Sequence, residues 1–298
     1  MAILAGPKTR VICQGLTGRA ATYHVARMMA YGTTIVAGVT PGKGGQRHLD
    51  VPIFDTVAGA VTTTGANASL VFVPPQNAAA AMIEAIEAGI GLLVCVTERV
   101  PVLDMIRVRQ ALIGSATKLV GANSQGILVP GVTQLGVMTT VHARKGPVGI
   151  ASRSASLTSE VVAQTTHAGL GQSTTVGVGG DPAHGMSLAD CVDLFLDDPQ
   201  TEAIVVIGEI GGREEEDVAS LLARKTIDKP VIALIVGRHA PPDRRMGHAG
   251  ALIAGASGSA DAKIAALRDV GVHIVRRVDL VGVTTRQALL HRAAMDCV

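Results

Sequence analysis

The chain contains very few aromatic residues. Its 298 residues include no tryptophan, two tyrosines and three phenylalanines, so aromatic residues make up 2% of a sequence that is 48% hydrophobic. A core with so little aromatic material must be built from valine, isoleucine, leucine and alanine, which favours buried parallel strands covered by alanine-rich helices. The length exceeds that of one typical domain and predicts two domains of about 150 residues each.

The cysteines do not form the pattern of a disulfide framework or of a metal site. Cys13, Cys95, Cys191 and Cys297 are widely scattered, and no two of them form a C-x-x-C pair. Three of them lie in or beside apolar stretches, where a cysteine is usually a buried thiol. We therefore predict reduced, buried thiols, and neither disulfides nor a bound metal.

The sequence also lacks a strong net charge, a long apolar run and a signal peptide. Its net charge is +2, far from the basic composition typical of nucleic-acid-binding proteins. No apolar run reaches membrane-spanning length without a glycine or a charge, and the first residues do not resemble a secretory signal. These absences predict a cytoplasmic protein of a reducing compartment that binds neither nucleic acid nor membranes.

Two series of short apolar runs alternate with longer alanine-rich segments, a pattern typical of doubly wound parallel sheets. Between them, the segment 121–147 breaks this rhythm with asparagine, serine, glutamine, glycine and proline, and indicates a linker or domain edge. The sequence thus predicts two α/β domains in tandem. In the first we expect strands at 11–13, 34–39, 69–73, 92–96 and 118–120, and helices at 20–30, 57–63, 78–88 and 102–112. In the second we expect strands at 148–151, 174–178, 203–207, 231–236 and 273–275, and helices at 156–167, 187–196, 214–223 and 260–270.

The end of the first predicted strand has the features of a phosphate-binding turn. Gly15 and Gly18 allow a tight turn, and the helix that follows offers unpaired backbone N–H groups to an anion. The spacing is not the G-x-G-x-x-G dinucleotide fingerprint, and Lys43 follows the second strand where such a site has an acidic residue. The cation favours a phosphate-rich ligand over NAD, although a glycine-rich turn with a solvated lysine would have the same sequence.

The most informative stretch is Arg244–Gly250, which places His248 between Gly247 and Gly250. A histidine in a turn is usually an ordinary surface residue, but a neutral imidazole can also be phosphorylated or act as a base. Glu209 ends a predicted strand and can accept a hydrogen bond from one imidazole nitrogen, which leaves the other nitrogen to attack phosphorus. The pair predicts a phosphohistidine site.

A serine-rich segment opens the first helix of the second domain. Ser154 and Ser156 are good helix N-cap residues, and capping accounts for part of their presence. The N-terminal amides and hydroxyls of this helix would also stabilise the negative charge of a phosphorylated histidine.

Several of these motifs resemble those of the succinyl-CoA synthetase α-subunit family, and the resemblance covers nearly the whole chain. It implies an α/β fold with a Rossmann-like CoA-binding domain at 1–122, a linker or substrate loop at 123–146, and a flavodoxin-like ligase domain with the phosphohistidine at 147–298. The matching segments are Gln14–Gly18, Gly38–Gly45, Val73–Pro75, Val96–Glu98, Ile207–Gly212 and Met246–Gly255.

The resemblance also implies roles for individual residues. It makes His248 the phosphorylated residue and Glu209 the residue that orients it. It assigns phosphate binding to Ser154, Ala155 and Ser156. It implies that CoA is bound by Thr17, Gly18, Arg19, Ala20, Lys43, Pro74, Val96, Thr97 and Glu98.

The implied reaction needs a partner. A β subunit with an ATP-grasp site, in an αβ or α₂β₂ assembly, would bind ATP or GTP with Mg²⁺. Phosphate would pass from the nucleotide to His248 and then to a short carboxylic acid, and the thiol of CoA would displace it to give the acyl-CoA.

The chain departs from the family pattern where the acid would bind. Typical members have a Gly-Pro-Asn-Cys-Pro-Gly loop and a tyrosine, whereas this chain has Asn123, Ser124 and Gln125 in the loop and Ser159 in place of the tyrosine. We place the substrate at these four residues and expect a roomier, more polar pocket. That predicts malate or a sulfonated carboxylate such as sulfoacetate as the acid, with an ordinary succinyl-CoA synthetase α subunit as the alternative.

Two functions of other classes compete with this interpretation. A nicotinamide-dependent oxidoreductase would use the first domain as a Rossmann unit, but Lys43 disfavours NAD. A CoA-sensing module without chemistry would have no use for the pair of Glu209 and His248.

Overall fold

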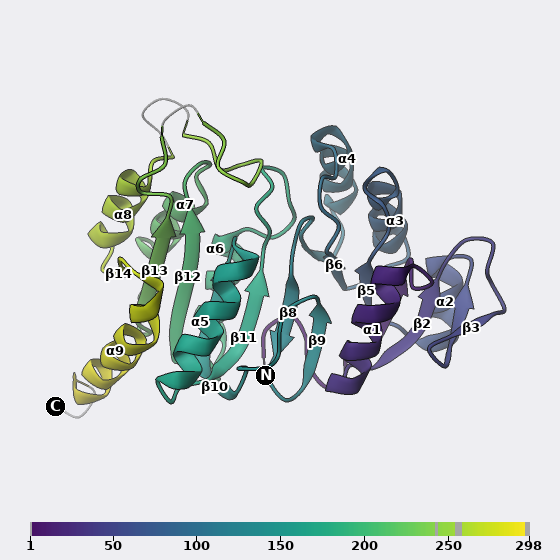
Figure 1. Cartoon of the computed structure of the whole chain (residues 1–298), viewed down its shortest axis with the longest axis horizontal. Helices are drawn as coiled ribbons and strands as arrows, with labels where there is room; N and C mark the ends of the chain where they lie inside the picture. The colour runs from purple at the N-terminus through teal and green to yellow at the C-terminus, as the bar shows by residue number, and fades with distance from the viewer. Residues whose placement is uncertain (1, 242–243, 254–257, 296–298) are drawn as a thin grey trace. The chain divides into compact units, whose positions relative to one another are not determined.

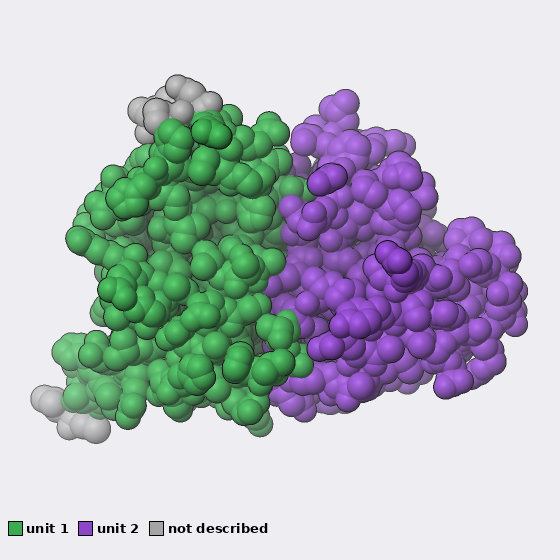
Figure 2. All heavy atoms as spheres, in the orientation of Figure 1, with its two compact units in different colours: residues 1–3, 139–182, 187–298 green, residues 4–138, 183–186 purple. Residues whose placement is uncertain are grey.

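The computed structural model describes residues 2–241, 244–253 and 258–295. The chain divides into two compact units, shown in Figure 2: unit 2 comprises residues 4–138 and 183–186, and unit 1 comprises residues 1–3, 139–182 and 187–298. The prediction for Cys297 and the last two residues of the Met246–Gly255 motif fall outside the described residues. Each unit is described by itself below.

Unit 2 is built around a parallel sheet in the order β3-β4-β2-β1-β5-β6-β7, in which only the short β3 runs antiparallel to its neighbour (Figure 1). The aliphatic side chains predicted for the core lie in this sheet, and β1, β5 and β6 are buried along their whole lengths. The strands are β1 (Val11–Gln14), β2 (Ile35–Val39), β3 (Arg47–His48), β4 (Val51–Phe54), β5 (Ala68–Val71), β6 (Leu92–Cys95) and β7 (Lys118–Val120).

The helices of unit 2 form where apolar residues recur with helical spacing. In α3, Ala78, Met82 and Ala85 share one buried face, and Pro75 occupies the first turn, where its missing N–H costs nothing. The helix α2 begins after Thr56, whose hydroxyl accepts a hydrogen bond from the backbone N–H of Gly59 at 3.2 Å. The helices are α1 (Arg19–Tyr31), α2 (Val57–Thr64), α3 (Pro75–Glu87) and α4 (Val102–Leu112).

The strand order of unit 2 reverses next to β1. The chain leaves β1 for β2 on one side and later returns to β5 on the other side, so the strand order reverses there. In open α/β sheets, ligands bind outside the carboxyl ends of the strands at such a point. The glycine-rich turn predicted to bind phosphate therefore lies at the expected edge.

Residues 123–146, expected as a linker or substrate loop, contain regular structure. A hairpin of β8 (Gly126–Val129) and β9 (Thr133–Gly136) forms there within unit 2. Thr33 fixes β9, because its hydroxyl donates to the carbonyl of Gln134 at 2.8 Å and accepts from the N–H of the same residue at 3.0 Å. The surrounding glycines and asparagine concealed the short apolar run that forms β8.

Unit 1 contains five parallel strands in the order β14-β13-β12-β10-β11. Numbered along the chain this order is 2-1-3-4-5, that of flavodoxin-like folds, so the predicted fold class is confirmed for both halves. These strands are β10 (Lys145–Ser152), β11 (Gln172–Gly177), β12 (Ala203–Glu209), β13 (Val231–Val236) and β14 (His273–Val275).

The helices of unit 1 cover both faces of its sheet. Figure 1 shows α5 and α9 together on one face, and α6 and α7 lie side by side on the other with α8 next to them. The sequence did not predict α9, which opens with β-branched residues of modest helix propensity. This helix is stabilised by packing against α5, because Gly282 lies so close to α5 that a Cβ there would overlap the carbonyl of Gln164. The helices are α5 (Ala155–His167), α6 (Leu188–Asp197), α7 (Glu214–Leu222), α8 (Ala260–Asp269), α9 (Val281–Met295) and the 3₁₀ turn η1 (Val278–Leu280).

Three further features bear on the expectations from the sequence. Cys13, Cys95 and Cys191 are buried thiols that form no disulfide among the described residues, and burial raises the pKa of the Cys13 thiol. In the described part of the chain, no group of histidine, cysteine and acidic side chains is arranged to hold a metal ion. None of the helices within the described ranges is long and apolar enough to cross a membrane.

Candidate active site

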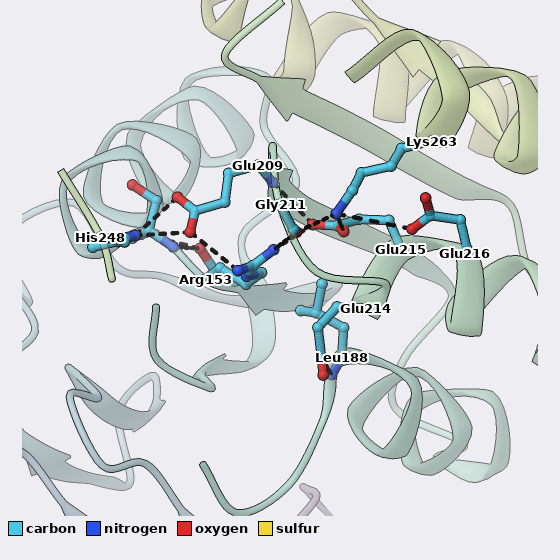
Figure 3. Close-up of polar contacts among 11 residues, drawn as sticks. Arg153, Leu188, Glu209, Gly211, Glu214, Glu215, Glu216, His248 and Lys263 are labelled. Carbon is cyan, nitrogen blue, oxygen red and sulfur yellow. Dashed lines mark hydrogen bonds and ion pairs between the residues drawn. The ribbon is translucent and has the colours of Figure 1, made fainter. Parts of the chain in front are cut away.

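Glu209 and His248, which are 39 residues apart in the sequence, lie in contact in unit 1 (Figure 3). Glu209 is the last residue of β12, and its carboxylate accepts a hydrogen bond from Nδ1 of His248, with N–O distances of 2.8 and 2.9 Å to its two oxygens. The Glu209 side chain is 8% exposed and that of His248 is 32% exposed. A buried carboxylate thus holds an imidazole that remains open to solvent on one side.

The contact changes the proton affinity of the imidazole. The hydrogen bond with Glu209 raises the pKa of His248 above its ordinary value, and this effect outweighs partial burial, which lowers it. The charge of Arg153 opposes the rise, whereas Asp181 adds to it. Because Nδ1 is engaged by Glu209, the contact fixes the orientation of the ring and directs its chemistry to Nε2.

The loop around His248, called the histidine loop below, is held by hydrogen bonds within its own turn. The imidazole of His248 also packs closely against Gly180. Ala251 donates its N–H to the carbonyl of His248 at 3.1 Å, and Met246 donates to the carbonyl of Ala251 at 2.9 Å. A Cβ at Gly180 would overlap Nδ1 of the imidazole. A side chain at Gly180 would therefore push the ring away from Glu209.

The predicted phosphate-binding residues begin α5. Ser154 caps the helix, because its hydroxyl accepts from the N–H of Leu157 at 3.4 Å, and Ala155 and Ser156 are exposed at the first turn. Ser159 lies one turn further along and is half-buried. The start of α5, which is predicted to bind phosphate, thus lies directly after Arg153, a residue that itself contacts Glu209.

Sequence reasoning missed a cluster of buried charges behind Glu209. The sequence analysis assigned no role to Arg153, Glu215 or Lys263, yet all three are buried and paired with one another or with Glu209. The sequence does contain a signal for this cluster. Lys263 lies between Ala260 and Leu267 on the buried face of α8, and charge on such a face indicates a buried partner.

In unit 2, three of the nine predicted CoA-binding residues line a cavity of about 480 Å³ at the carboxyl edge of the sheet. Thr17, Gly18 and Pro74 line it, and the Lys43 amine donates a hydrogen bond to the Thr17 hydroxyl at 3.0 Å. Gly18 precedes α1 without a side-chain cap, so the backbone N–H groups of the first turn face outward. Arg19 and Ala20 are exposed in that turn.

The remaining predicted residues of unit 2 lie at the end of β6. Thr97 donates its hydroxyl to the carbonyl of Val73 at 2.8 Å, and its own carbonyl accepts from the N–H of Asn123 at 2.9 Å. The N–H of Ser124 binds the carbonyl of Cys95 at 3.2 Å, so the loop at 123–125 is tied to this strand end. Val96 is half-buried beside them, Glu98 is exposed and Gln125 is buried.

Comparison with known proteins agrees with both halves of this description. A family model described as a CoA binding domain matches residues 7–99, and one described as CoA-ligase matches residues 151–273. A protein of Aquifex aeolicus named succinate–CoA ligase [ADP-forming] subunit alpha is 48% identical over 291 residues, which are 97% of this chain and 95% of that protein. The protein of the same name from Staphylococcus epidermidis is 45% identical over 95% of this chain and 94% of its own length.

The chain belongs to the succinate–CoA ligase α-subunit family. It is therefore a CoA-ligase subunit, as the resemblance of its motifs predicted. Solved structures show the same fold in more distant proteins. ATP citrate lyase from Methanosaeta concilii, a mutant in complex with (3S)-citryl-CoA, matches 99% of this chain with a TM-score of 0.88 at 23% identity. An acetyl-coenzyme A synthetase from Ca. Korarchaeum cryptofilum matches 97% with a TM-score of 0.72 at 17% identity.

This succinate–CoA ligase family member spans 52% of the citrate lyase chain and 61% of the acetyl-coenzyme A synthetase chain. At identities this low the likeness concerns the fold alone.

The Glu209 carboxylate is expected to control the ionisation of His248. Replacing Glu209 with Gln removes the charged acceptor that raises the pKa, so the midpoint of His248, above 6.5 in the native chain, should fall. NMR titration of the histidine ring signals measures both midpoints. His24 lies in unit 2, where burial lowers its pKa, and its midpoint should not move. An unchanged His248 midpoint in Glu209→Gln would contradict the assignment.

The same pair predicts a pH-dependent stability. Since the folded-state pKa of His248 lies above the unfolded value, the contact contributes stability that is fully present below about pH 6.5 and is lost as the pH rises through the folded-state pKa. The difference in urea midpoint between the native chain and Glu209→Gln should therefore be larger at about pH 6 than at about pH 9. An equal difference at the two pH values would show that the imidazole does not contribute.

Proposed function

We propose that the chain is the α subunit of an ADP-forming carboxylic acid–CoA ligase in which His248 carries the phosphoryl group between nucleotide and acid. The observation that supports this most directly is the contact between the buried Glu209 carboxylate and Nδ1 of His248. An imidazole held in this way keeps its proton on Nδ1 and presents the lone pair of Nε2, the arrangement that a nucleophilic histidine needs.

In the first half-reaction, Nε2 of His248 attacks the terminal phosphorus of the nucleotide. The new N–P bond forms as the P–O bond to the leaving nucleoside diphosphate breaks, and the developing positive charge of the ring is balanced by Glu209. Serine and backbone N–H groups at the start of α5, at Ser154, Ala155 and Ser156, are proposed to bind the transferred phosphate oxygens. The exposed first turn of this helix supports that role.

In the second half-reaction, a carboxylate oxygen of the acid attacks the phosphorus and releases His248. The resulting acyl phosphate is then attacked at its carbonyl carbon by the thiol of CoA, and inorganic phosphate leaves. The covalent step on His248 divides one difficult transfer into two easier ones.

We place CoA at the carboxyl edge of the unit 2 sheet. The cavity and the uncapped start of α1 support this, because a helix N-terminus with Lys43 beside it suits a phosphate-rich ligand better than NAD. CoA supplies the thiol of the reaction. The proposed binding residues are Thr17, Gly18, Arg19, Ala20, Lys43, Pro74, Val96, Thr97 and Glu98.

The name of the relatives supports a heteromeric enzyme. Their designation as subunit alpha leads us to propose a β subunit that holds the nucleotide with Mg²⁺ in an ATP-grasp site, in an αβ or α₂β₂ assembly. Their description as ADP-forming favours ATP over GTP. A cytoplasmic location remains a prediction from the sequence.

For the acid, the comparisons favour succinate over the malate or sulfoacetate predicted from the sequence, because the relatives are named for succinate. One structural detail also weakens the polar-pocket hypothesis. The Ser124 hydroxyl accepts a hydrogen bond from the N–H of Gly126 at 2.7 Å and so helps to shape its own loop. In favour of the hypothesis, Nε2 of Gln125 is buried without a hydrogen-bond partner among the described residues. We propose succinate.

The phosphohistidine is tested by incubating the chain, coexpressed with its partner subunit, with ATP labelled at the terminal phosphate. We expect base-stable, acid-labile label on the native chain and none on His248→Asn, because asparagine has no nucleophilic nitrogen. His142→Asn, which alters an exposed histidine that was given no role in the site, is the matched control and should be labelled like the native chain. Label that persists on His248→Asn would refute the assignment.

The CoA site is tested by calorimetric titration of the full chain with CoA and with NAD. CoA should bind and NAD should not, and Lys43→Ala should weaken CoA binding by about tenfold through loss of a charged hydrogen bond. Lys118→Ala is the control, since this exposed lysine begins β7 and lies at the opposite edge of the sheet. Tight binding of NAD without a response to CoA would favour the oxidoreductase alternative.

The acid is identified by comparing kcat/KM for succinate, malate and sulfoacetate on the coexpressed complex. We expect succinate to be preferred by about tenfold or more, because a site built for one acid leaves its polar groups unpaired with another. A preference for malate or sulfoacetate would instead support the polar pocket. The double variant Ser124→Cys/Gln125→Pro, which restores the residues typical of the family, should then shift the preference toward succinate.

A further inference from the structure

The Arg153 guanidinium lies between two buried carboxylates in unit 1 (Figure 3). Its Nη2 is 3.3 Å from Oε1 of Glu209, and its Nη1 is 3.3 Å from Oε1 of Glu215. Nη1 also donates to the carbonyl of Gly211 at 3.1 Å. The Arg153 side chain is 3% exposed, so Arg153 is a buried cation, and these three contacts fix the position of its guanidinium.

A second buried cation in this cluster, Lys263, pairs with Glu215. The amine of Lys263 forms an ion pair with Oε2 of Glu215 and donates to the carbonyl of Gly211 at 2.7 Å. Oε1 of Glu215 also accepts from the N–H of Glu209 at 2.9 Å. The ion pairs of Lys263 among the described residues are thus with Glu215 and Glu216, whereas Arg153 is the cation of this cluster that forms an ion pair with Glu209.

Arg153 is also fixed to the elements that carry the candidate active site. Its backbone N–H donates to the carbonyl of Ile207, two residues before Glu209 on β12, at 3.0 Å. Its Nη2 lies 3.3 Å from where a Cβ of Gly250 would be, so the guanidinium reaches the histidine loop. Arg153 thus contacts the acid through its side chain and the strand that carries the acid through its backbone, and its guanidinium lies beside the loop that carries His248.

Among the described residues, the side-chain partners of the Glu209 carboxylate are Arg153 and His248, so without Arg153 it would be a buried charge held by a partly exposed imidazole. Burying a carboxylate is costly unless it is paired and hydrogen-bonded, so the group would rotate toward water or take up a proton. Rotation would break, and protonation would weaken, the hydrogen bond that keeps the proton of the neutral imidazole on Nδ1.

We propose that Arg153 is a positioning residue for the phosphorylation site: it holds the Glu209 carboxylate against Nδ1 of His248, and so keeps the proton of the neutral imidazole on Nδ1 and the Nε2 lone pair turned toward the phosphoryl donor. This inference rests on the proposed function, in which Nε2 is the nucleophile. Arg153 acts through Glu209.

Lys263 offers a matched control within the same cluster. It is a buried cation, it contacts the same carbonyl of Gly211 and the same carboxylate of Glu215, and its ion pairs among the described residues are with Glu215 and Glu216. Arg153→Met and Lys263→Met therefore each remove one buried positive charge. Only Arg153→Met removes the ion pair with Glu209. If Arg153 had a merely structural role in the cluster, the two variants would change the tautomer of His248 and the phosphorylation rate to the same extent.

The deciding measurement is the tautomer of the neutral His248 ring in the full chain labelled with ¹⁵N-histidine, recorded well above the His248 midpoint and assigned with His248→Asn. The native chain and Lys263→Met should carry the proton on Nδ1. Arg153→Met should move toward the Nε2–H form that an unrestrained imidazole prefers. If Arg153→Met keeps the native tautomer, or if both variants lose it equally, the proposal is overturned.

Phosphorylation of the coexpressed complex with labelled ATP provides the second readout. The initial rate should fall by about tenfold or more in Arg153→Met, since a histidine in the wrong tautomer loses its nucleophilic nitrogen, and should stay within about twofold in Lys263→Met. A native chain that takes up no label while the tautomers behave as expected would refute the proposed function and leave the positioning of Glu209 standing.

A charge-balanced variant keeps the test decisive if Arg153→Met does not fold. Arg153→Met/Glu215→Gln removes one charge of each sign, and the Gln side-chain oxygen can still accept from the N–H of Glu209. Its control is Lys263→Met/Glu215→Gln. The same tautomer and rate in these two double variants would overturn the proposal, whereas loss in the first alone would support it.

Discussion

The candidate active site depends on the burial of one carboxylate, that of Glu209. A charged group in this position is tolerable only because Arg153 and His248 both contact it, and the pairing of Glu215 with Lys263 keeps the surrounding charge in balance. The same contacts decide which imidazole nitrogen can react. Stability and chemistry in unit 1 therefore rest on the same contacts to the Glu209 carboxylate.

The two units use the same physical device in different ways. Both are parallel sheets whose strands end at an edge where helix N-termini offer backbone N–H groups. In unit 2 that edge carries an exposed lysine and a cavity, which suits the binding of an intact anionic ligand. In unit 1 it carries a buried acid that points at a histidine, which suits covalent transfer of a phosphoryl group.

The fold class and the pairing of Glu209 with His248 could be predicted from the sequence, because there the local patterns and the tertiary structure agree. The alternation of apolar runs with alanine-rich segments gave the α/β class, and a strand that ends in an acid placed Glu209 opposite His248. What could not be predicted depends on long-range packing. The helix α9 is stabilised by the close approach of Gly282 to α5, and the ladder of the β8–β9 hairpin relies on Thr33, about a hundred residues earlier. Arg153 was visible in the sequence, but its partners lie 56 and 62 residues away, on β12 and α7.

Gly180 has a consequence for how this protein can vary. It makes no chemical contribution of its own, yet the space it leaves is the space that the imidazole occupies. Amino-acid exchange at this position is thus limited by volume, and alanine, usually the mildest replacement, is already too large. In a library of random variants selected for ligase activity, position 180 should be as intolerant as the reacting residues, although it would never be found by looking for reactive side chains.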